Sequence, residues 1–163
     1  MENLRSLKTL QRGGKSKYVK LCDTSDGVKI IKKAYDKKEE KLVFRFNKEI
    51  EFMTHLKNCP FVPKIISVDH EKLVIYMSYV GNSIDESKTE NQKQKTKAKT
   101  QIKDNKTKMQ EKMKSLHLDW NLMRHRDGKP NYNIYLGNAT IMNDEISIID
   151  FGSQHYKIVG PPR

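Results

Sequence analysis

The chain has 163 residues, enough for one hydrophobic core or for two small lobes that share a cleft, and too few for two independent domains of usual size. Hydrophobic residues make up 36% of the chain and charged residues 32%, so much of the charge must lie on solvated faces or in a segment that does not fold tightly. The net charge of +12 would attract any polyanion, whether nucleic acid, an anionic membrane surface, an acidic protein or a nucleotide.

The cysteine content and the start of the chain indicate an intracellular protein. Cys22 and Cys59 are the only cysteines, so no zinc cluster built on cysteine is expected. The opening stretch MENLRSLKTLQRGG has no apolar run of signal-peptide length, and no membrane-spanning stretch is expected. We therefore expect a reducing, cytoplasmic or nuclear setting without a membrane.

Short strands are predicted at the start of the chain. Val19 and Leu21 share one face with a period of two, DTSDG has turn chemistry, and VKIIKKAY is rich in strand-forming residues, so an antiparallel hairpin is expected. Before it, Gly13 and Gly14 stand at a strand bend. Missing side chains there would let backbone N–H groups approach an anion, although such a pair is more often a simple turn.

A helix is predicted over residues 39–57. Its apolar stripe is formed by Leu42, Phe46, Met53 and Leu56. Glu49 falls in the middle of this stripe, whereas Glu51 points to the opposite side. A carboxylate on the buried face needs a cationic partner, because an unpaired buried charge costs several kcal/mol.

The nearest cationic candidates lie on the preceding strand. Lys32 follows Ile30 on one face of that strand, and Lys33 follows Ile31 on the other, because side chains alternate. If the strand is central, one of these lysines must point into the protein; if it is an edge strand, both are solvated. An inward-facing Glu49 favours the first arrangement.

Two more strand-like runs, KIISV and KLVIYMSYV, follow and are separated by the turn DHE. They complete a sheet of about five antiparallel strands with one helix packed on it, which is an α+β fold. Gly81 and Asn82 mark a break at the end of this sheet.

The middle of the chain is rich in lysine. Ten lysines fall between Lys88 and Lys114. Residues 85–97 lack apolar side chains, and a helical stripe then runs from Ala98 to Leu116. A solvated helix face explains this charge; nucleic-acid contact is the alternative, but the interleaved aromatic residues of a stacking platform are missing.

The last third contains a predicted hairpin. NIYLGNATIM and EISIID flank the tight turn ND. The hairpin is expected to bring Asp127, Asn133 and Asp150 to one edge. Oxygen ligands gathered in this way suit a hard cation such as Mg²⁺.

The order of these features resembles that of the protein-kinase superfamily. A glycine-containing hairpin, the strand IIKK, the helix NKEIEFMTHL, the break IYMSYVG, the loop HRDGKPNYNIYL and IIDFG follow one another over residues from about 7 to 153. The loop and IIDFG are the specific part. The resemblance implies a two-lobe fold with an N-lobe over residues 1–81, a much reduced helical C-lobe over residues 82–163, and a connector at 77–81.

Carried over residue by residue, the resemblance implies that Lys32 contacts the ATP phosphates and pairs with Glu49. Asp127 would orient the substrate hydroxyl, Lys129 would steady the γ-phosphate, and Asp150 would hold Mg²⁺. The other implied positions are the phosphate-facing Gly13 and Gly14, the adenine-facing main chain at Met77 and Tyr79, and the metal ligand Asn133.

The sequence also departs from the family pattern. Gln11 and Ser16 stand where the family has glycines, and Tyr132 stands at the usual place of the metal-binding asparagine. Asn131 and Asn133 are therefore both candidates, and Asn133 is preferred because the apolar run IYL follows it directly.

Eleven residues follow Gly152, without an activation segment. Small kinases of the tRNA-modifying KEOPS assembly and some lipopolysaccharide-sugar kinases are similarly abbreviated. The sequence leaves the substrate open, and a partner protein that supplies the substrate-binding surface is one expectation.

We expect an ATP- and Mg²⁺-dependent phosphotransferase, of the Ser/Thr protein kinase type. The first alternative is a non-catalytic pseudokinase that binds nucleotide or acts as a scaffold. The retention of Lys32, Glu49, Asp127 and Asp150 argues against it. The second alternative is a basic module that binds nucleic acid through Lys88 to Lys114.

Overall fold

The computed structural model describes residues 3–12, 15–58, 60, 62–83, 100, 104, 139–143 and 145–150. These residues form eight strands and one helix, in agreement with the predicted α+β class. In chain order the elements are β1 (Arg5–Arg12), β2 (Tyr18–Asp23), β3 (Lys29–Ala34), α1 (Glu40–His55), β4 (Ile65–Asp69), β5 (Val74–Ser78), β6 (Asn82–Ser83), β7 (Ala139–Met142) and β8 (Glu145–Ile148).

The larger sheet has five antiparallel strands, which agrees with the predicted number of about five, and their order is β1-β2-β3-β5-β4. Strand β3 is therefore central, which rules out the edge-strand interpretation of its two lysines. Across to β5, Lys32 lies opposite Tyr76 and Lys33 lies opposite Ile75. Paired residues share a face of the sheet, and Ile75 is fully buried, so Lys33 and not Lys32 lies on the core side of β3.

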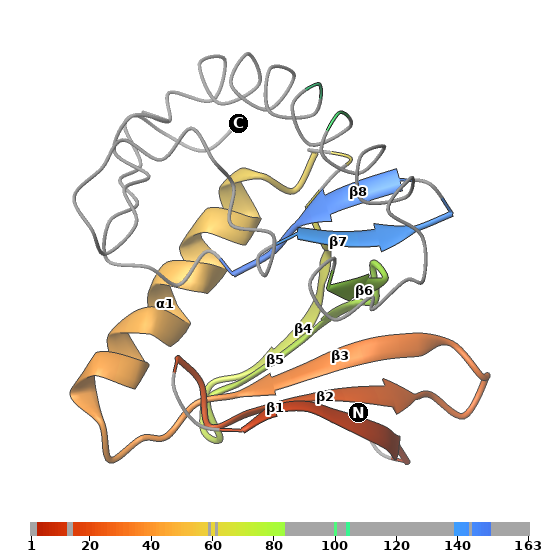
Figure 1. Ribbon diagram of the computed structural model, residues 1–163. Helices are drawn as coiled ribbons and strands as arrows, with labels where there is room; N and C mark the ends of the chain where they lie inside the picture. Colours follow the sequence, from red (N-terminus) through yellow and green to blue (C-terminus); the bar gives the residue numbers. More distant parts are fainter. Residues whose placement is uncertain are drawn as a thin grey trace.

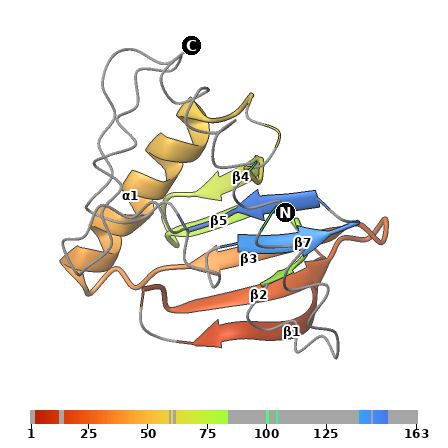
Figure 2. The same ribbon diagram turned by 45° about the horizontal axis from the view of Figure 1, so that its top comes forward.

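Helix α1 covers this core side. In both ribbon views it runs along one side of the five-stranded sheet (Figures 1 and 2). The predicted stripe is confirmed: Leu42, Phe46, Met53 and Leu56 are buried, as is Phe52. These side chains pack with Tyr35, Val62, Leu73, Ile75 and Met77 in one hydrophobic cluster.

A second, smaller sheet has the order β6-β7-β8. Strands β7 and β8 form the predicted antiparallel hairpin, with Met142 paired to Glu145 at its turn. The Thr140 hydroxyl donates a hydrogen bond of 2.7 Å to the Val80 carbonyl oxygen, which ties the hairpin to the segment that leaves β5. In Figure 1 the chain leaves β8 in the direction of α1. Asp150 lies on this exit.

Several predictions fall outside the described residues. They concern Gly13, Gly14, Cys59, Asp127, Lys129 and Asn133, together with the lysine-rich segment apart from Thr100 and Asp104. The division into lobes at residues 81 and 82 stays a prediction, although the change of sheet at β6 falls there. Within the described part of the chain, no helix combines the length and the apolar character of a membrane span.

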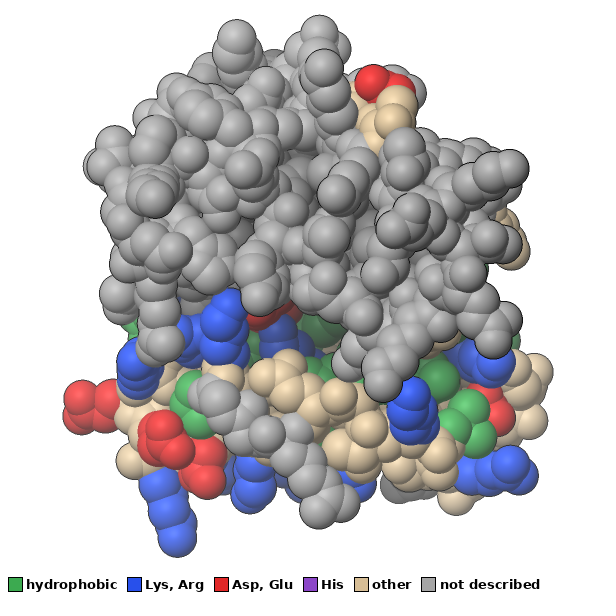
Figure 3. All heavy atoms as spheres, viewed as in Figure 1, with side chains coloured by type: hydrophobic (Ala, Val, Ile, Leu, Met, Phe, Trp, Pro, Cys, Tyr) green, Lys and Arg blue, Asp and Glu red, His purple; other side chains and the backbone are tan. Residues whose placement is uncertain are grey.

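Positive charge is not confined to the lysine-rich segment. Residues 1–81 contain 17 Lys and Arg against 10 Asp and Glu. The face drawn in Figure 3 shows Lys and Arg side chains distributed over the described part of the molecule, with acidic side chains between them. A polyanion therefore has basic side chains to meet on the five-stranded sheet as well.

Candidate active site

The centre of the candidate site is a buried ion pair between β3 and α1. The Lys33 Nζ donates hydrogen bonds to both carboxylate oxygens of Glu49, at 3.0 Å to Oε1 and 2.7 Å to Oε2. Glu49 is 1% exposed, so its predicted position on the buried stripe is confirmed, and Glu51 is exposed as expected. The bidentate contact compensates a carboxylate that helix periodicity places inside the protein.

The pairing of Glu49 with Lys32, which the family resemblance implies, is wrong. Lys32 lies on the opposite face of β3, where its Nζ is 5.7 Å from the centre of the Tyr76 ring. The ion pair with Glu49 is made by the next residue, Lys33. Because neighbouring strand residues point to opposite faces, this shift of one residue separates the half-buried Lys32 from the buried Lys33.

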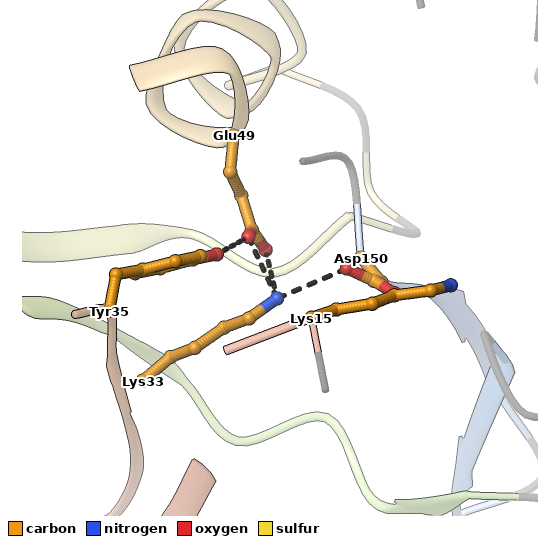
Figure 4. A network of polar contacts seen from close by, with 5 residues as sticks. All are labelled: Lys15, Lys33, Tyr35, Glu49 and Asp150. Carbon is orange, nitrogen blue, oxygen red and sulfur yellow. Dashed lines mark hydrogen bonds and ion pairs between the residues drawn. The ribbon is translucent and has the colours of Figure 1, made fainter. Parts of the chain in front are cut away.

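Asp150 joins the ion pair from the exit of β8. Its Oδ1 lies 3.2 Å from the Lys33 Nζ, so this ammonium bridges the carboxylates of Glu49 and Asp150 (Figure 4). These two residues are 101 positions apart in the sequence. Asp150 has a backbone φ of 71°, in the left-handed region that residues other than glycine rarely adopt. Such conformations persist where surrounding contacts hold them, and they cluster at functional sites.

Tyr35 is a further member of this network that the sequence argument did not single out. It directly follows β3, on the same face as Lys33, and its buried hydroxyl donates a short hydrogen bond to Glu49 Oε2. Its ring packs edge-on against Phe46 of α1, with 5.6 Å between the ring centres. Glu49 is therefore held from one side by Lys33 and from the other by Tyr35.

Lys15 contacts the same aspartate from the turn between β1 and β2. Its Nζ lies 3.4 Å from Asp150 Oδ2, and its side chain is 41% exposed. Each carboxylate oxygen of Asp150 thus has one ammonium group beside it. Lys15 and Lys33 carry two positive charges, Glu49 and Asp150 carry two negative charges, and the network is neutral as a whole.

The electrostatics favour the charged forms of Asp150 and Lys33. Burial alone would raise the pKa of Asp150, but the ammonium groups of Lys33 and Lys15 lower it to about 2. Burial alone would lower the pKa of Lys33, but the carboxylates of Asp150 and Glu49 hold it well above its usual value. Burial, and then the Glu49 carboxylate, raise the pKa of Tyr35, so its phenol keeps the proton that it donates.

The family resemblance implies a connector between lobes at residues 77–81. Met77 and Ser78 belong to β5, and the Met77 side chain lies in the hydrophobic cluster. Tyr79 follows β5, and its hydroxyl donates a hydrogen bond of 3.0 Å to Asn82 Oδ1. A connector between lobes at these residues stays a prediction. Adenine contact by the main chain of Met77 and Tyr79 stays a prediction.

The donor set of the network fits a polyphosphate with its cation. Ammonium groups match phosphate oxygens, and a carboxylate matches a hard cation. The Asp150 side chain is 20% exposed and therefore reachable. The hydroxyl of Ser16, next to Lys15, is buried and has no hydrogen-bond partner among the described residues. In the same part of the chain, no three His, Cys, Asp or Glu side chains are grouped for a metal ion.

The sequence gives little indication of which lysines belong to this site. The sequence alone does not distinguish Lys33 from Lys32, because Ile31 and Tyr35 flank Lys33 with a period of two and the buried Ile30 and Ala34 flank Lys32 in the same way. No local signal indicates Lys15, since its contact spans 135 residues. A comparison of the sequence with protein-family models and with curated proteins found no match. The geometry is therefore the basis of the functional interpretation.

Proposed function

We propose that the chain is an ATP-dependent phosphotransferase of the protein-kinase type, which transfers the γ-phosphate of ATP to a hydroxyl group, with Ser/Thr-type chemistry. The observation that carries this proposal is the Lys33 ammonium that bridges Glu49 and Asp150. At the Nζ of Lys33, on central strand β3, Glu49 of helix α1 meets Asp150, which follows the hairpin. The resemblance implies this combination, with the lysine moved by one position.

The proposal explains why so polar a network is buried. A buried ion pair is weak support for stability, because desolvation offsets the attraction between the charges. A hydrophobic set of the same volume would hold β3 and α1 together equally well. Pre-positioned charges, in contrast, stabilise a developing charge without reorganisation at the moment of reaction.

In this mechanism Glu49 and Tyr35 are positioning residues. They fix the Lys33 ammonium, so that it can neutralise the phosphates of bound ATP. Asp150 offers a carboxylate to the cation, and Mg²⁺ supplies charge neutralisation between the phosphate groups when it is bound. Asp127 would orient the acceptor hydroxyl in line with the γ-phosphate, and Lys129, two positions later in the sequence, would steady that phosphate. The roles of these two residues rest on the sequence.

The test is a transfer assay with the purified full chain, Mg²⁺ and γ-labelled ATP. Wild type is compared with Asp127→Ala and Asp150→Asn, and a generic basic protein is supplied as acceptor. Transfer that disappears in both variants supports the proposal. Equal labelling in all three proteins contradicts it, and retention of ATP without any labelling is the result expected of a nucleotide-binding scaffold.

A further inference from the structure

The contact between Lys15 and Asp150 is not needed by the proposed chemistry. Lys15 lies in the turn between β1 and β2, whose end is fixed to β3 by a hydrogen bond of 2.8 Å from the Lys17 N–H to the Ala34 carbonyl oxygen. The turn therefore holds its place beside the network, and the Lys15 side chain extends from it to Asp150 (Figure 4). A cation here competes with any metal ion for the same carboxylate.

The two ammonium groups on Asp150 differ in how firmly they are held. The Lys33 side chain is 10% exposed, and it binds Glu49 as well as Asp150. Lys15 is 41% exposed and makes the longer contact, 3.4 Å against 3.2 Å. Exposed ion pairs contribute little, because water competes for both charges and the long side chain loses freedom. Lys15 is thus the partner that Asp150 releases more easily.

A divalent cation on Asp150 would displace Lys15. The cation needs a carboxylate oxygen, and Oδ2 faces Lys15. Two positive charges on one carboxylate oxygen repel each other, so the ammonium must withdraw. Phosphate groups that share the cation bring several negative charges to the same place. These phosphate oxygens would then be the new partner of the released ammonium.

We propose that Lys15 switches partners: it binds Asp150 in the nucleotide-free site and the phosphate oxygens of ATP in the loaded site. This inference rests on the proposed function, since it takes ATP as the ligand. It also explains a departure from the family pattern. Gln11 and Ser16 replace two glycines of the phosphate loop, which leaves fewer positions for close backbone approach. The Lys15 ammonium replaces part of the phosphate binding that backbone N–H groups of the glycine loop would provide.

The switch has a consequence that a purely structural role lacks. Without nucleotide, removal of the Lys15 charge frees Asp150 for a cation. With ATP bound, the same change removes an ammonium group that contacts the phosphates. Affinity for the cation alone should therefore rise, while affinity for ATP falls. Adenosine has no phosphates, so its affinity should not change.

The experiment compares wild type with Lys15→Gln and with the control Lys17→Gln, an exposed lysine of the same turn. Binding of Mn²⁺ alone is measured by its electron spin resonance signal, and binding of ATP and adenosine by calorimetry. For Lys15→Gln we expect Mn²⁺ binding tighter by about 3-fold and ATP binding weaker by about 10-fold, on the scale of one exposed ion pair and one charge-assisted hydrogen bond. Lys17→Gln should resemble wild type.

The possible failures are distinguishable. If wild type binds ATP and Lys15→Gln binds it equally well, or binds Mn²⁺ no more tightly, the switch is wrong while the proposed function stands. An equal loss of ATP and adenosine affinity shows a damaged turn and also overturns the switch. If wild type binds neither ATP nor adenosine, the proposed function fails and the switch fails with it.

Discussion

The two faces of strand β3 hold their lysines in different ways. On the face of Lys32, neighbouring strands offer Lys20 on one side and Tyr76 on the other, and the ammonium rests near an aromatic ring. On the face of Lys33, helix α1 and the exit of β8 each contribute a carboxylate. The role of a strand lysine therefore depends on which side chains the neighbouring elements place on its face of the sheet.

The comparison is tested most strongly by the removal of each lysine in turn. Lys33→Met leaves the Glu49 and Asp150 carboxylates without their shared cation, and should lower the free energy of unfolding by about 3–5 kcal/mol. Lys32→Met loses a cation–π contact and relieves repulsion from Lys20, so its effect should stay within about 1 kcal/mol. Urea unfolding followed by circular dichroism measures both. Similar losses in the two variants would remove the distinction between the faces.

The helix side of the pair offers a second test. Glu49→Gln keeps the shape but removes the charge that holds Lys33, and should cost about 2–3 kcal/mol, the range of hydrogen bonds to charged groups. Glu51→Gln is the matched control: its side chain is 47% exposed and its ion pair with Lys48 lies at the surface, so the change should stay within about 0.5 kcal/mol. Thermal unfolding curves of both variants measure these two losses in the free energy of unfolding.

The aspartate contributes a pH dependence of known sign. The pKa of Asp150 is lowered from 3.8 to about 2, so its contribution is present above pH 3.8 and is lost as the pH falls through about 2. At 1.36 kcal/mol per pKa unit, it amounts to about 2 kcal/mol. The gap in unfolding free energy between wild type and Asp150→Asn should therefore close between about pH 4 and pH 2. A gap that stays constant over this range would mean that Asp150 is not held by the two lysines.

The smallest expected effect is that of the tyrosine hydroxyl. Tyr35→Phe keeps the ring against Phe46 and removes the hydrogen bond to Glu49, which should cost about 1–2 kcal/mol. Tyr18→Phe, where the ring lies under Lys20, serves as the control and should change stability by less than about 0.5 kcal/mol. If both variants are equally stable, the Tyr35 hydroxyl does not position Glu49.

The fold was predictable from the sequence where local periodicity decides. Strand β1 is the exception, since no strand is predicted over its residues 5–12. The stripe of α1 buries Glu49 and exposes Glu51, and the alternation and turn residues correctly place β2, β3, β4, β5 and the β7–β8 hairpin. Each of these features depends on neighbours within a few residues. The two-lobe arrangement depends on residues 84 to 138, most of which lie outside the described part, and stays a prediction.

The site was predictable only in part, because its contacts are long-range. Helix periodicity identified Glu49, because it places this carboxylate on an apolar stripe. The choice between Lys32 and Lys33 required the face that β3 turns toward α1, and alignment with a family pattern gave the wrong lysine. The meeting of Lys15 with Asp150 joins the first turn of the chain to its last described residue, and no spacing rule anticipates it.

We propose that ATP binds at the Lys33 face of β3 and not at the Lys32 face. The most direct test of this proposal is ATP affinity, measured by calorimetry with Mg²⁺ for wild type, Lys33→Met and Lys32→Met, at a temperature where circular dichroism shows all three proteins folded. We expect Lys33→Met to weaken ATP binding by about 10-fold or more, because at least one charge-assisted contact is lost, and Lys32→Met to stay within about 2-fold of wild type. Equal affinities in all three proteins, or a loss confined to Lys32→Met, would contradict it.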